Sequence, residues 1–290
     1  MSNGQDPQGF ENPAGLVTGI IFRTMHDHTA TLHGLKVHYR VEGQGPDILL
    51  LHGWMSSRRM WAHFSSPLAA THRCWSLDLP GCGDSDKPAD DWYSIPNYTA
   101  VLREFLHAVG LRRTHVVGHS MGGMIALDLA AAHPEAVERL VVINPVVTGR
   151  ARTRPLVHLN WNHGRPLIDL TLRLSPKFVQ PVLSHPLGER LPMRVKHFRR
   201  RTEDFFKGTP DSVLGSGRAT LTYDVAPRLA HITAPTLVIV GSRDAVVPSS
   251  EGQLVAKRIL GSRLVVLRAG HLVTDERPAE TLRLVQEFLT

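Results

Sequence analysis

The sequence predicts an α/β fold, a doubly wound and mostly parallel eight-stranded sheet flanked by helices, with an inserted helical cap. Short apolar runs of strand length alternate with segments of helical spacing along most of the chain. This alternation fails over residues 146–228 and returns at Thr236. With 290 residues, 42% hydrophobic and 20% charged, the chain can bury one large core and carry an inserted subdomain.

Changes of pattern divide the chain into an arm, a core and a cap. Residues 1–22 are mostly polar and punctuated by Gly and Pro, which predicts a loose N-terminal arm. Residues 23–145 and 229–290 carry the alternating pattern and form the predicted core. Residues 146–228 are rich in Arg, Pro and short helical patterns and contain no convincing buried strand, so we expect them to form the helical cap.

The predicted strands are of two kinds. Residues 35–41 (LKVHYRV) alternate like a half-buried strand, whereas residues 47–51 (DILLL) are continuously apolar, as a strand covered on both faces would be. The earlier stretch MHDHTATLH, with His26 and His28, is expected to be a solvated loop, because no further ligand pattern supports a metal there. The other predicted strands are residues 73–79, 114–118, 139–144, 236–241 and 263–267, and the helical segments among them end at residues 67–70 or cover residues 98–109, 121–132, 252–259 and 279–288.

The composition argues against membrane-spanning and disulfide-rich proteins. The longest apolar run near the N-terminus, residues 16–22, is much shorter than the roughly 18 to 20 residues that cross a bilayer, and no basic flank precedes it. We therefore expect neither a signal peptide nor a transmembrane helix. Cys74 and Cys82 are too few for a disulfide scaffold and lack Cys-x-x-Cys spacing, so we expect free thiols in a cytoplasmic protein.

A candidate nucleophile lies in the stretch VVGHSMGG, where Ser120 stands between Gly118 and Gly122. A serine hydroxyl is a poor nucleophile near neutral pH unless a base takes its proton and its oxyanion product is stabilised. The pattern G-x-S-x-G between a strand and a helix is typical of a sharp turn that exposes the hydroxyl, with the helix dipole and the Met121 N–H beside the developing charge. The alternative is that Ser120 only caps the helix, but the flanking strand and helix favour a nucleophile.

The base and the acid that such a serine needs should follow in the order Ser, Asp, His, each directly after a strand. Asp244 follows the run TLVIVG, and His271 follows the run RLVVL. The run RLVVIN before them ends in Asn144 and Pro145 and offers no carboxylate. Most of the 17 histidines must be solvated or structural, and position alone singles out His271.

A second N–H for the oxyanion is expected from the loop after residues 47–51. In that loop His52 and Gly53 shape the turn, and Trp54 is expected to donate its backbone N–H. The alternative is that Trp54 only lines a pocket wall, and the two roles are compatible. We expect His52, Gly53 and His119 to support the substrate pocket.

From about Thr29 to Thr290 the chain resembles the α/β-hydrolase superfamily. The resemblance rests on four matches: HGW at residues 52–54, DLPGCGDSDKP at 78–88, GHSMGG at 118–123, and the paired tail GSRDAVVP with GHLVTDERPAE. It implies Ser120 as the nucleophile, His271 as general base and acid, and Asp244 as the residue that orients His271. It implies that Trp54 and Met121 are the oxyanion donors, and that no metal or organic cofactor is needed.

The serine also narrows the choice of reaction. Haloalkane dehalogenases and epoxide hydrolases of this superfamily use an aspartate nucleophile, so Ser120 argues against both. The HGW and SMGG stretches are similar to those of cofactor-free haloperoxidases, and carbon–carbon bond hydrolases also combine Ser-Met-Gly-Gly with a helical cap. We expect a carboxylesterase-like enzyme that cleaves an ester, or a related acyl bond, of a hydrophobic or amphipathic small molecule through an acyl-enzyme. Thioester cleavage, acyl transfer, perhydrolysis, carbon–carbon cleavage and non-catalytic ligand binding are the alternatives.

The net charge of +7 is concentrated in the predicted cap. Residues 146–228 hold 12 Arg and 3 Lys against 6 acidic residues, a net of +9, and the rest of the chain has a net of −2. Within them, residues 191–206 place Phe198 and Phe205 near one helical face, which we expect to dock on the sheet with solvated arginines around it. The alternatives are that the arginines attract an anionic membrane surface, making the protein peripheral to a membrane, an acidic carrier protein or a negatively charged substrate. We expect no nucleic-acid partner, because no recognition module is present.

Overall fold

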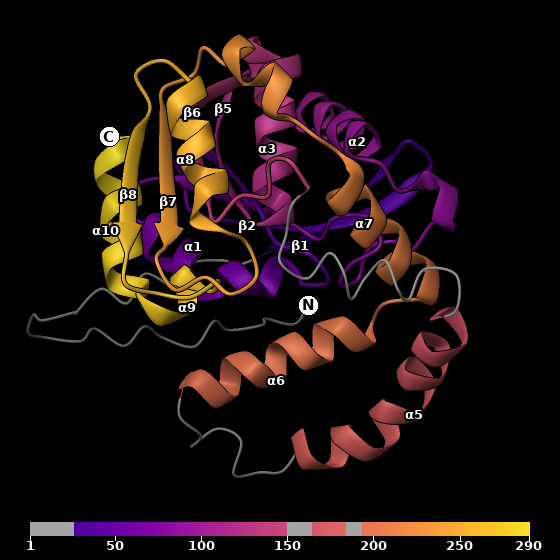
Figure 1. Ribbon diagram of the computed structural model, residues 1–290. Coiled ribbons are helices and arrows are strands. Elements are labelled where there is room, and N and C mark those ends of the chain that lie inside the picture. Colours follow the sequence, from indigo (N-terminus) through magenta and orange to yellow (C-terminus); the bar gives the residue numbers. More distant parts are fainter. Residues whose placement is uncertain (1–25, 150–163, 184–192) are drawn as a thin grey trace, which may run out of the picture.

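The computed structural model describes residues 26–149, 164–183 and 193–290 (Figure 1). The predicted arm, residues 1–22, lies outside the described residues. The described chain forms one eight-stranded sheet with the strand order β1-β2-β4-β3-β5-β6-β7-β8. Its strands are β1 (His26–Leu32), β2 (Leu35–Glu42), β3 (Asp47–Leu51), β4 (Arg73–Leu77), β5 (Thr114–His119), β6 (Val137–Ile143), β7 (Thr236–Gly241) and β8 (Arg263–Leu267).

The sheet is mostly parallel, which confirms the predicted fold class. β2 is antiparallel to its two neighbours, β1 and β4, and all the other pairings are parallel. From β3 the chain passes to β4 on one side and then to β5 on the other, so the strand order reverses at β3. Binding sites of open α/β sheets lie beyond the carboxyl ends of the strands at such a reversal. The loops after β3 and β5 meet there.

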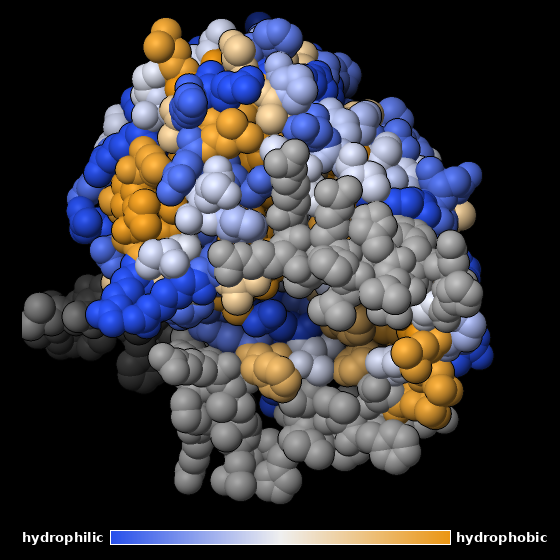
Figure 2. Space-filling view, in the orientation of Figure 1, coloured by the Kyte–Doolittle hydropathy of each residue, from blue (hydrophilic) through white to orange (hydrophobic). Residues whose placement is uncertain are grey.

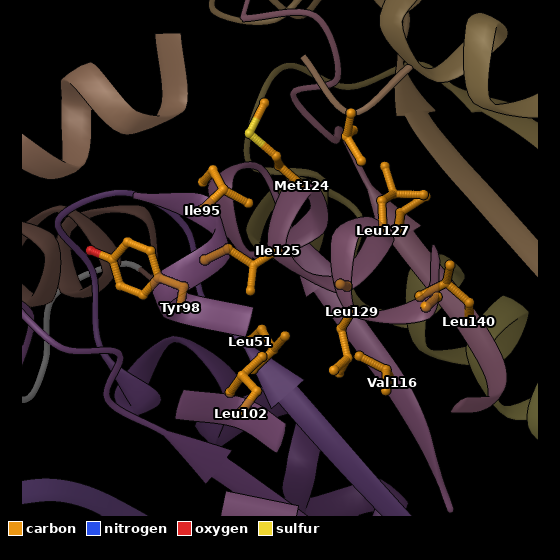
Figure 3. Packing of buried hydrophobic residues seen from close by; sticks show 14 of the residues in the cluster. Leu51, Ile95, Tyr98, Leu102, Val116, Met124, Ile125, Leu127, Leu129 and Leu140 are labelled. Atoms are coloured by element: carbon orange, nitrogen blue, oxygen red, sulfur yellow. The ribbon is translucent and has the colours of Figure 1, made fainter. Parts of the chain in front are cut away.

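Helices cover both faces of the sheet, and the core lies between them and the strands (Figure 1). Leu49 and Leu51 of β3 belong to the cluster on the side of α2 and α3, whereas Ile48 and Leu50 belong to the cluster on the side of α1 and α10. Figure 3 shows the first cluster, in which Leu51 lies among residues of α2, α3 and the neighbouring strands. The core helices are α1 (Ala62–Leu68), α2 (Ile95–Ala108), α3 (Met121–Ala132), α8 (Ser249–Arg258), α9 (Val273–Glu276) and α10 (Pro278–Leu289).

Seven strands coincide with the predicted runs, and the eighth corrects a prediction. The stretch with His26 and His28 is strand β1 and not a loop. It pairs along its whole length with β2, from His26 opposite Val41 to Leu32 opposite Leu35. Because β1 is one of the two edge strands of the sheet, much of it is exposed, and its polar composition suits this position.

Between β6 and β7 the described chain contains three α-helices, α5 (Arg165–Leu183), α6 (Met193–Phe206) and α7 (Pro210–Thr222), and the short 3-10 helix η5 (Ala226–His231). Figure 1 shows α5 and α6 side by side beyond the carboxyl ends of the parallel strands, with α7 leading from α6 back along the core. Residues 150–163 and 184–192 of the predicted cap lie outside the described residues, and the domain boundaries stay predictions. None of the described helices combines the length and the apolar character needed to span a bilayer.

Part of the buried face of α6 is polar, whereas the predicted docking face was apolar; of the two predicted residues, Phe205 is partly buried and packs on an apolar cluster. Phe198 is 62% exposed, whereas His197, Arg200 and Asp204 are buried. These three residues lie three and four positions apart and therefore share one side of the helix. His197 and Arg200 each lie 3.3 Å from a carboxylate oxygen of Asp275 in α9. The prediction holds for Phe205 and is wrong for Phe198, because it considered only apolar residues as docking residues.

Candidate active site

Ser120 occupies the sharp turn between β5 and α3. Its backbone has φ 55° and ψ −116°, a conformation that side-chain-bearing residues rarely adopt, and its hydroxyl makes no capping hydrogen bond to α3. Glycine is needed on both sides of this turn. A Cβ atom on Gly118 would lie 2.3 Å from the carbonyl oxygen of Gly122, and one on Gly122 would lie 2.4 Å from that of Leu51. The turn therefore presents the Ser120 hydroxyl and does not use it as a cap.

The structure joins Ser120, His271 and Asp244 in one hydrogen-bonded chain, although they are far apart in the sequence. The Ser120 Oγ and His271 Nε2 atoms are 3.0 Å apart, and His271 Nδ1 lies 2.7 Å from Asp244 Oδ2. An ionised carboxylate can only accept, so the hydrogen on the imidazole belongs on Nδ1. The lone pair of Nε2 then faces the serine hydroxyl, which donates to it.

Asp244 is held as an ionised acceptor. Its side chain is 1% exposed, and its Oδ1 accepts hydrogen bonds from the N–H groups of Val246 at 2.7 Å and Val247 at 2.8 Å. Burial raises the pKa of Asp244, but the hydrogen bond from His271 and the two backbone N–H groups outweigh burial and lower its pKa below the usual value. The charge that orients His271 is therefore present at neutral pH.

Asn144, the residue directly after β6, holds the loop that carries His271. Its Nδ2 donates to the carbonyl oxygens of Gly270 at 3.1 Å and His271 at 2.8 Å. Its Oδ1 accepts from the N–H of Gly241 at 2.7 Å, at the end of β7. Asn144 itself has φ 44°, a left-handed conformation that asparagine tolerates better than most residues. From the sequence we noted only that this position lacks a carboxylate, and we missed that an amide can both donate and accept.

His119 also binds the backbone carbonyl group of His271. Its Nε2 lies 2.9 Å from the carbonyl oxygen of His271, and the two imidazole rings are 4.9 Å apart. Because a carbonyl only accepts, Nε2 carries the hydrogen and Nδ1 is bare. Burial and the neighbouring His271 lower the pKa of His119 to about 3, so the ring is neutral. His119, predicted as a supporting residue, thus helps to position His271.

The loop after β3 carries His52, Gly53 and Trp54, the residues expected near the oxyanion. His52 is fully buried; its Nε2 accepts from the N–H of Leu79 at 3.0 Å, so its Nδ1 carries the hydrogen that is donated to the Gly53 carbonyl at 2.8 Å. A Cβ atom on Gly53 would lie 3.3 Å from Cβ of Ser120, which shows how closely this loop approaches the serine. The residue that follows, Trp54, therefore begins beside the Ser120 turn.

The two expected oxyanion donors are the backbone N–H groups of Trp54 and Met121. Within the described part of the chain, neither group donates a hydrogen bond to another protein atom. Met121 is the first residue of α3, where backbone N–H groups have no partner within the helix and the helix dipole favours negative charge. Both groups are thus available to a ligand oxygen, and Ser120 lies directly before Met121.

A hollow of about 260 Å³ opens next to this loop, between it and α6. It is lined by Trp54, Met55, Ser56, Phe198, Arg201, Thr202 and Phe205. Ser120 is not among the lining residues, but Trp54 connects the hollow to Gly53 and through it to the serine. The indole Nε1 of Trp54 donates to the Val213 carbonyl of α7 at 3.3 Å, and this bond ties the wall of the hollow to the helices that follow β6.

The chain is similar to hydrolases over most of its length. Residues 46–278 match the α/β hydrolase fold family. The pimeloyl-(acyl-carrier protein) methyl ester esterase of Aeromonas hydrophila is 29% identical over 257 residues, which cover 85% of this chain and 96% of that protein. The 2-hydroxy-6-oxononadienedioate/2-hydroxy-6-oxononatrienedioate hydrolase of Paraburkholderia xenovorans is 30% identical over 268 residues, covering 88% and 91%. The crystal structure of the enol-lactonase from Burkholderia xenovorans has a TM-score of 0.74 at 26% identity and covers 90% of this chain and 99% of its own.

Proposed function

This chain belongs to the α/β hydrolase fold family, and we propose that it is a serine hydrolase that cleaves a carboxylic ester, or a related acyl bond, of a hydrophobic or amphipathic small molecule. One observation above all supports the proposal. Ser120, His271 and Asp244 form a continuous hydrogen-bonded chain, with distances of 3.0 and 2.7 Å. A hydroxyl, a base and an orienting carboxylate in this arrangement activate a serine for attack on a carbonyl carbon.

In the first half of the reaction, Ser120 Oγ attacks the carbonyl carbon of the ester while Nε2 of His271 takes the hydroxyl proton. The carbonyl π electrons move to oxygen, and the N–H groups of Trp54 and Met121 donate to the resulting oxyanion. When the tetrahedral species collapses, the bond to the alcohol oxygen breaks and His271 returns the proton to that oxygen. The alcohol leaves, and the acyl group remains on Ser120 as an ester.

In the second half, a water molecule attacks the acyl carbon and gives a proton to Nε2 of His271. The same two N–H groups hold the second oxyanion. Its collapse breaks the bond to Ser120 Oγ, which recovers its proton from His271, and the carboxylic acid is released. Asp244 stays ionised throughout and stabilises the imidazolium that forms in each half, so one base serves both steps.

The relative from Aeromonas, named an esterase, supports ester cleavage. A second candidate is hydrolysis of a carbon–carbon bond by the same residues, which the relative from Paraburkholderia favours. The two reactions are distinguished by substrate. An ester hydrolase turns over simple esters, whereas a carbon–carbon hydrolase acts on a dienol-ketone and leaves simple esters almost untouched.

The test is a comparison of wild-type protein with Ser120→Ala on p-nitrophenyl esters from acetate to laurate. We expect wild-type turnover with a chain-length optimum, and a fall of roughly 10⁴-fold or more in kcat in the variant. Ser250→Ala, which changes an exposed serine at the start of α8, is the matched control and should behave as wild type. A fluorophosphonate should label Ser120 and no other serine by mass spectrometry. Unchanged turnover in Ser120→Ala would overturn the proposal.

A further inference from the structure

Three consecutive arginines in α6 have different surroundings. Arg199 Nε lies 2.8 Å from a carboxylate oxygen of Glu203, one helical turn away. Arg200 is buried and lies 3.3 Å from Asp275 of α9. Arg201 is exposed, and among the described residues it has no acidic partner. Arg199 and Arg200 therefore form ion pairs within the protein, whereas the guanidinium of Arg201 can bind a ligand.

Arg201 lines the hollow of about 260 Å³ between α6 and the loop after β3. Most of the other walls are apolar, and Trp54 packs against Phe205 with their ring centroids 6.4 Å apart. In Figure 2 apolar and hydrophilic residues gather side by side in the region of α6. Ser56 and Thr202 add hydroxyl groups to the lining. The hollow thus combines an apolar surface with one cationic end, as a site for an amphipathic anion would.

The acidic residues next to the hollow do not neutralise Arg201. Glu203 is 2.7 Å from Arg59, in addition to its bond with Arg199. Asp204 accepts from Ser57 Oγ at 2.8 Å and lies 3.2 Å from Arg59. Both carboxylates therefore have their own donors. Among the residues that line the hollow, Arg201 therefore carries the one charge, and no neighbouring carboxylate of the described chain pairs with it.

The hollow is also close to the Ser120 turn. Its wall begins at Trp54, whose N–H is the proposed oxyanion donor, and the preceding Gly53 approaches Ser120 Cβ. The inference requires one small molecule to reach from Arg201, along the wall that Trp54 forms, to the Ser120 hydroxyl.

The geometry points to Arg201 as the residue that binds a carboxylate of the substrate, so that this enzyme prefers esters that carry a carboxylate at the end of a short apolar chain. This inference rests on the proposed ester hydrolysis. A guanidinium can bind a carboxylate through two parallel hydrogen bonds, and one unpaired cation matches one negative charge. The apolar walls accommodate the methylene groups between the carboxylate and the ester.

The first test compares two substrates that differ only at the end of the acyl chain. In p-nitrophenyl hydrogen adipate a carboxylate replaces the terminal methyl of p-nitrophenyl hexanoate. We expect wild-type protein to prefer the adipate ester in kcat/KM, and Arg201→Met to lose about ten-fold on that ester alone, mainly through KM. Arg201→Lys should recover part of the loss. Salt should lower the preference in wild-type protein, because an exposed ion pair is screened.

Arg112→Met is the matched control, since it removes one exposed positive charge at the opposite end of β5 from Ser120. It should leave both rates unchanged. A second substrate pair moves the carboxylate to the alcohol side: the hexanoate ester of 4-hydroxybutanoate against butyl hexanoate. The inference is overturned if neither pair shows a preference that Arg201→Met removes, or if this variant slows charged and neutral esters equally.

Binding to Ser120→Ala separates this inference from the proposed reaction. We expect calorimetry to show tighter binding of the adipate ester than of the hexanoate ester, and Arg201→Met to abolish the difference. If wild-type protein cleaved no ester but this binding preference were found, the proposed function would fail and the carboxylate site would stand. Equal binding of the two esters would overturn the carboxylate site even if Ser120-dependent hydrolysis were observed.

Discussion

Replacing Asn144 by glycine should destabilise the protein and displace His271. The change removes three hydrogen bonds, two donated to the carbonyls of Gly270 and His271 and one accepted from the Gly241 N–H. At a net contribution of about 1 kcal/mol each, their loss lowers the free energy of unfolding by about 3 kcal/mol. Glycine adopts the φ of 44° without strain, so the backbone conformation itself is not disturbed. Asn144→Ala should cost roughly 1–2 kcal/mol more, because alanine is strained in the left-handed region.

Urea and thermal unfolding measure the stability effect, and steady-state kinetics measure the position of His271. For 290 residues, a loss of about 3 kcal/mol corresponds to a fall in Tm of about 5 °C. We expect kcat to fall about 10- to 100-fold, because a base displaced by even a fraction of an ångström loses its alignment with Ser120. His119 still donates to the His271 carbonyl, so activity should not vanish.

The control is Ser262→Ala, which removes one side-chain hydrogen bond, to the Ala256 carbonyl at 3.0 Å, away from the site. It should change the free energy of unfolding by no more than about 1 kcal/mol and leave kcat unchanged. If Asn144→Gly unfolded within about 0.5 kcal/mol of wild-type protein and kept its kcat, the assignment of Asn144 as the support of the His271 loop would be refuted.

Two further predictions concern His119 and the glycines of the serine turn. The pKa of His119 is lowered to about 3 from 6.5, so the unfolded chain binds the proton more readily, and stability present above pH 6.5 is lost as the pH falls toward 3. Chemical denaturation measures the free energy of unfolding from pH 7 to 4. In His119→Gln this free energy should fall less steeply with decreasing pH than in wild-type protein, by up to about 1.4 kcal/mol per pH unit. An unchanged slope would contradict the buried neutral ring. Gly122→Ala should prevent stable folding, because its Cβ would lie 2.4 Å from the Leu51 carbonyl oxygen, as judged by soluble yield and circular dichroism. In the control Gly110→Ala the new Cβ meets no atom within 4 Å, and only the φ of 74° is unfavourable, so the free energy of unfolding should fall by about 1–2 kcal/mol. Equal destabilisation by Gly122→Ala and Gly110→Ala would contradict the role of backbone crowding at Gly122.

The sequence predicted the parts of the site that follow single strands. Ser120, Asp244 and His271 each come after a continuously apolar run, and parallel strands place their carboxyl ends at one edge of the sheet. Their mutual contacts then follow from strand order alone. The role of Asn144 could not be predicted in this way, because it depends on the ends of three neighbouring strands meeting at one amide. No local pattern in the sequence marks such a meeting point.

The errors elsewhere have a shared physical origin. Strand β1 was missed because an edge strand with exposed side chains needs no apolar pattern. The polar part of the docking face of α6 was missed because His197, Arg200 and Asp204 bind the core through ion pairs and hydrogen bonds. Hydropathy periodicity detects apolar burial alone. Both features become visible only when the partner strand or the partner carboxylate is known.

The positive charge of the chain is concentrated in residues 146–228, and ion pairs join the end of this basic segment to the core. The basic segment and the rest of the chain pair with each other through Arg200–Asp275, Lys207–Asp84, Arg218–Asp90, Arg228–Asp128 and Arg59–Glu203. The three pairs that are partly exposed on both sides, Lys207–Asp84, Arg218–Asp90 and Arg59–Glu203, contribute only about 0–1 kcal/mol each, so their main effect is to fix where these helices sit. Since Asp275 lies four residues after His271, and Arg59 five after Trp54, α6 contacts the chain beside both the base and the proposed oxyanion donor. The attraction of an anionic membrane surface or an acidic carrier protein stays a prediction, and Arg201 differs from Arg199 and Arg200 because, among the described residues, it takes no part in such pairing.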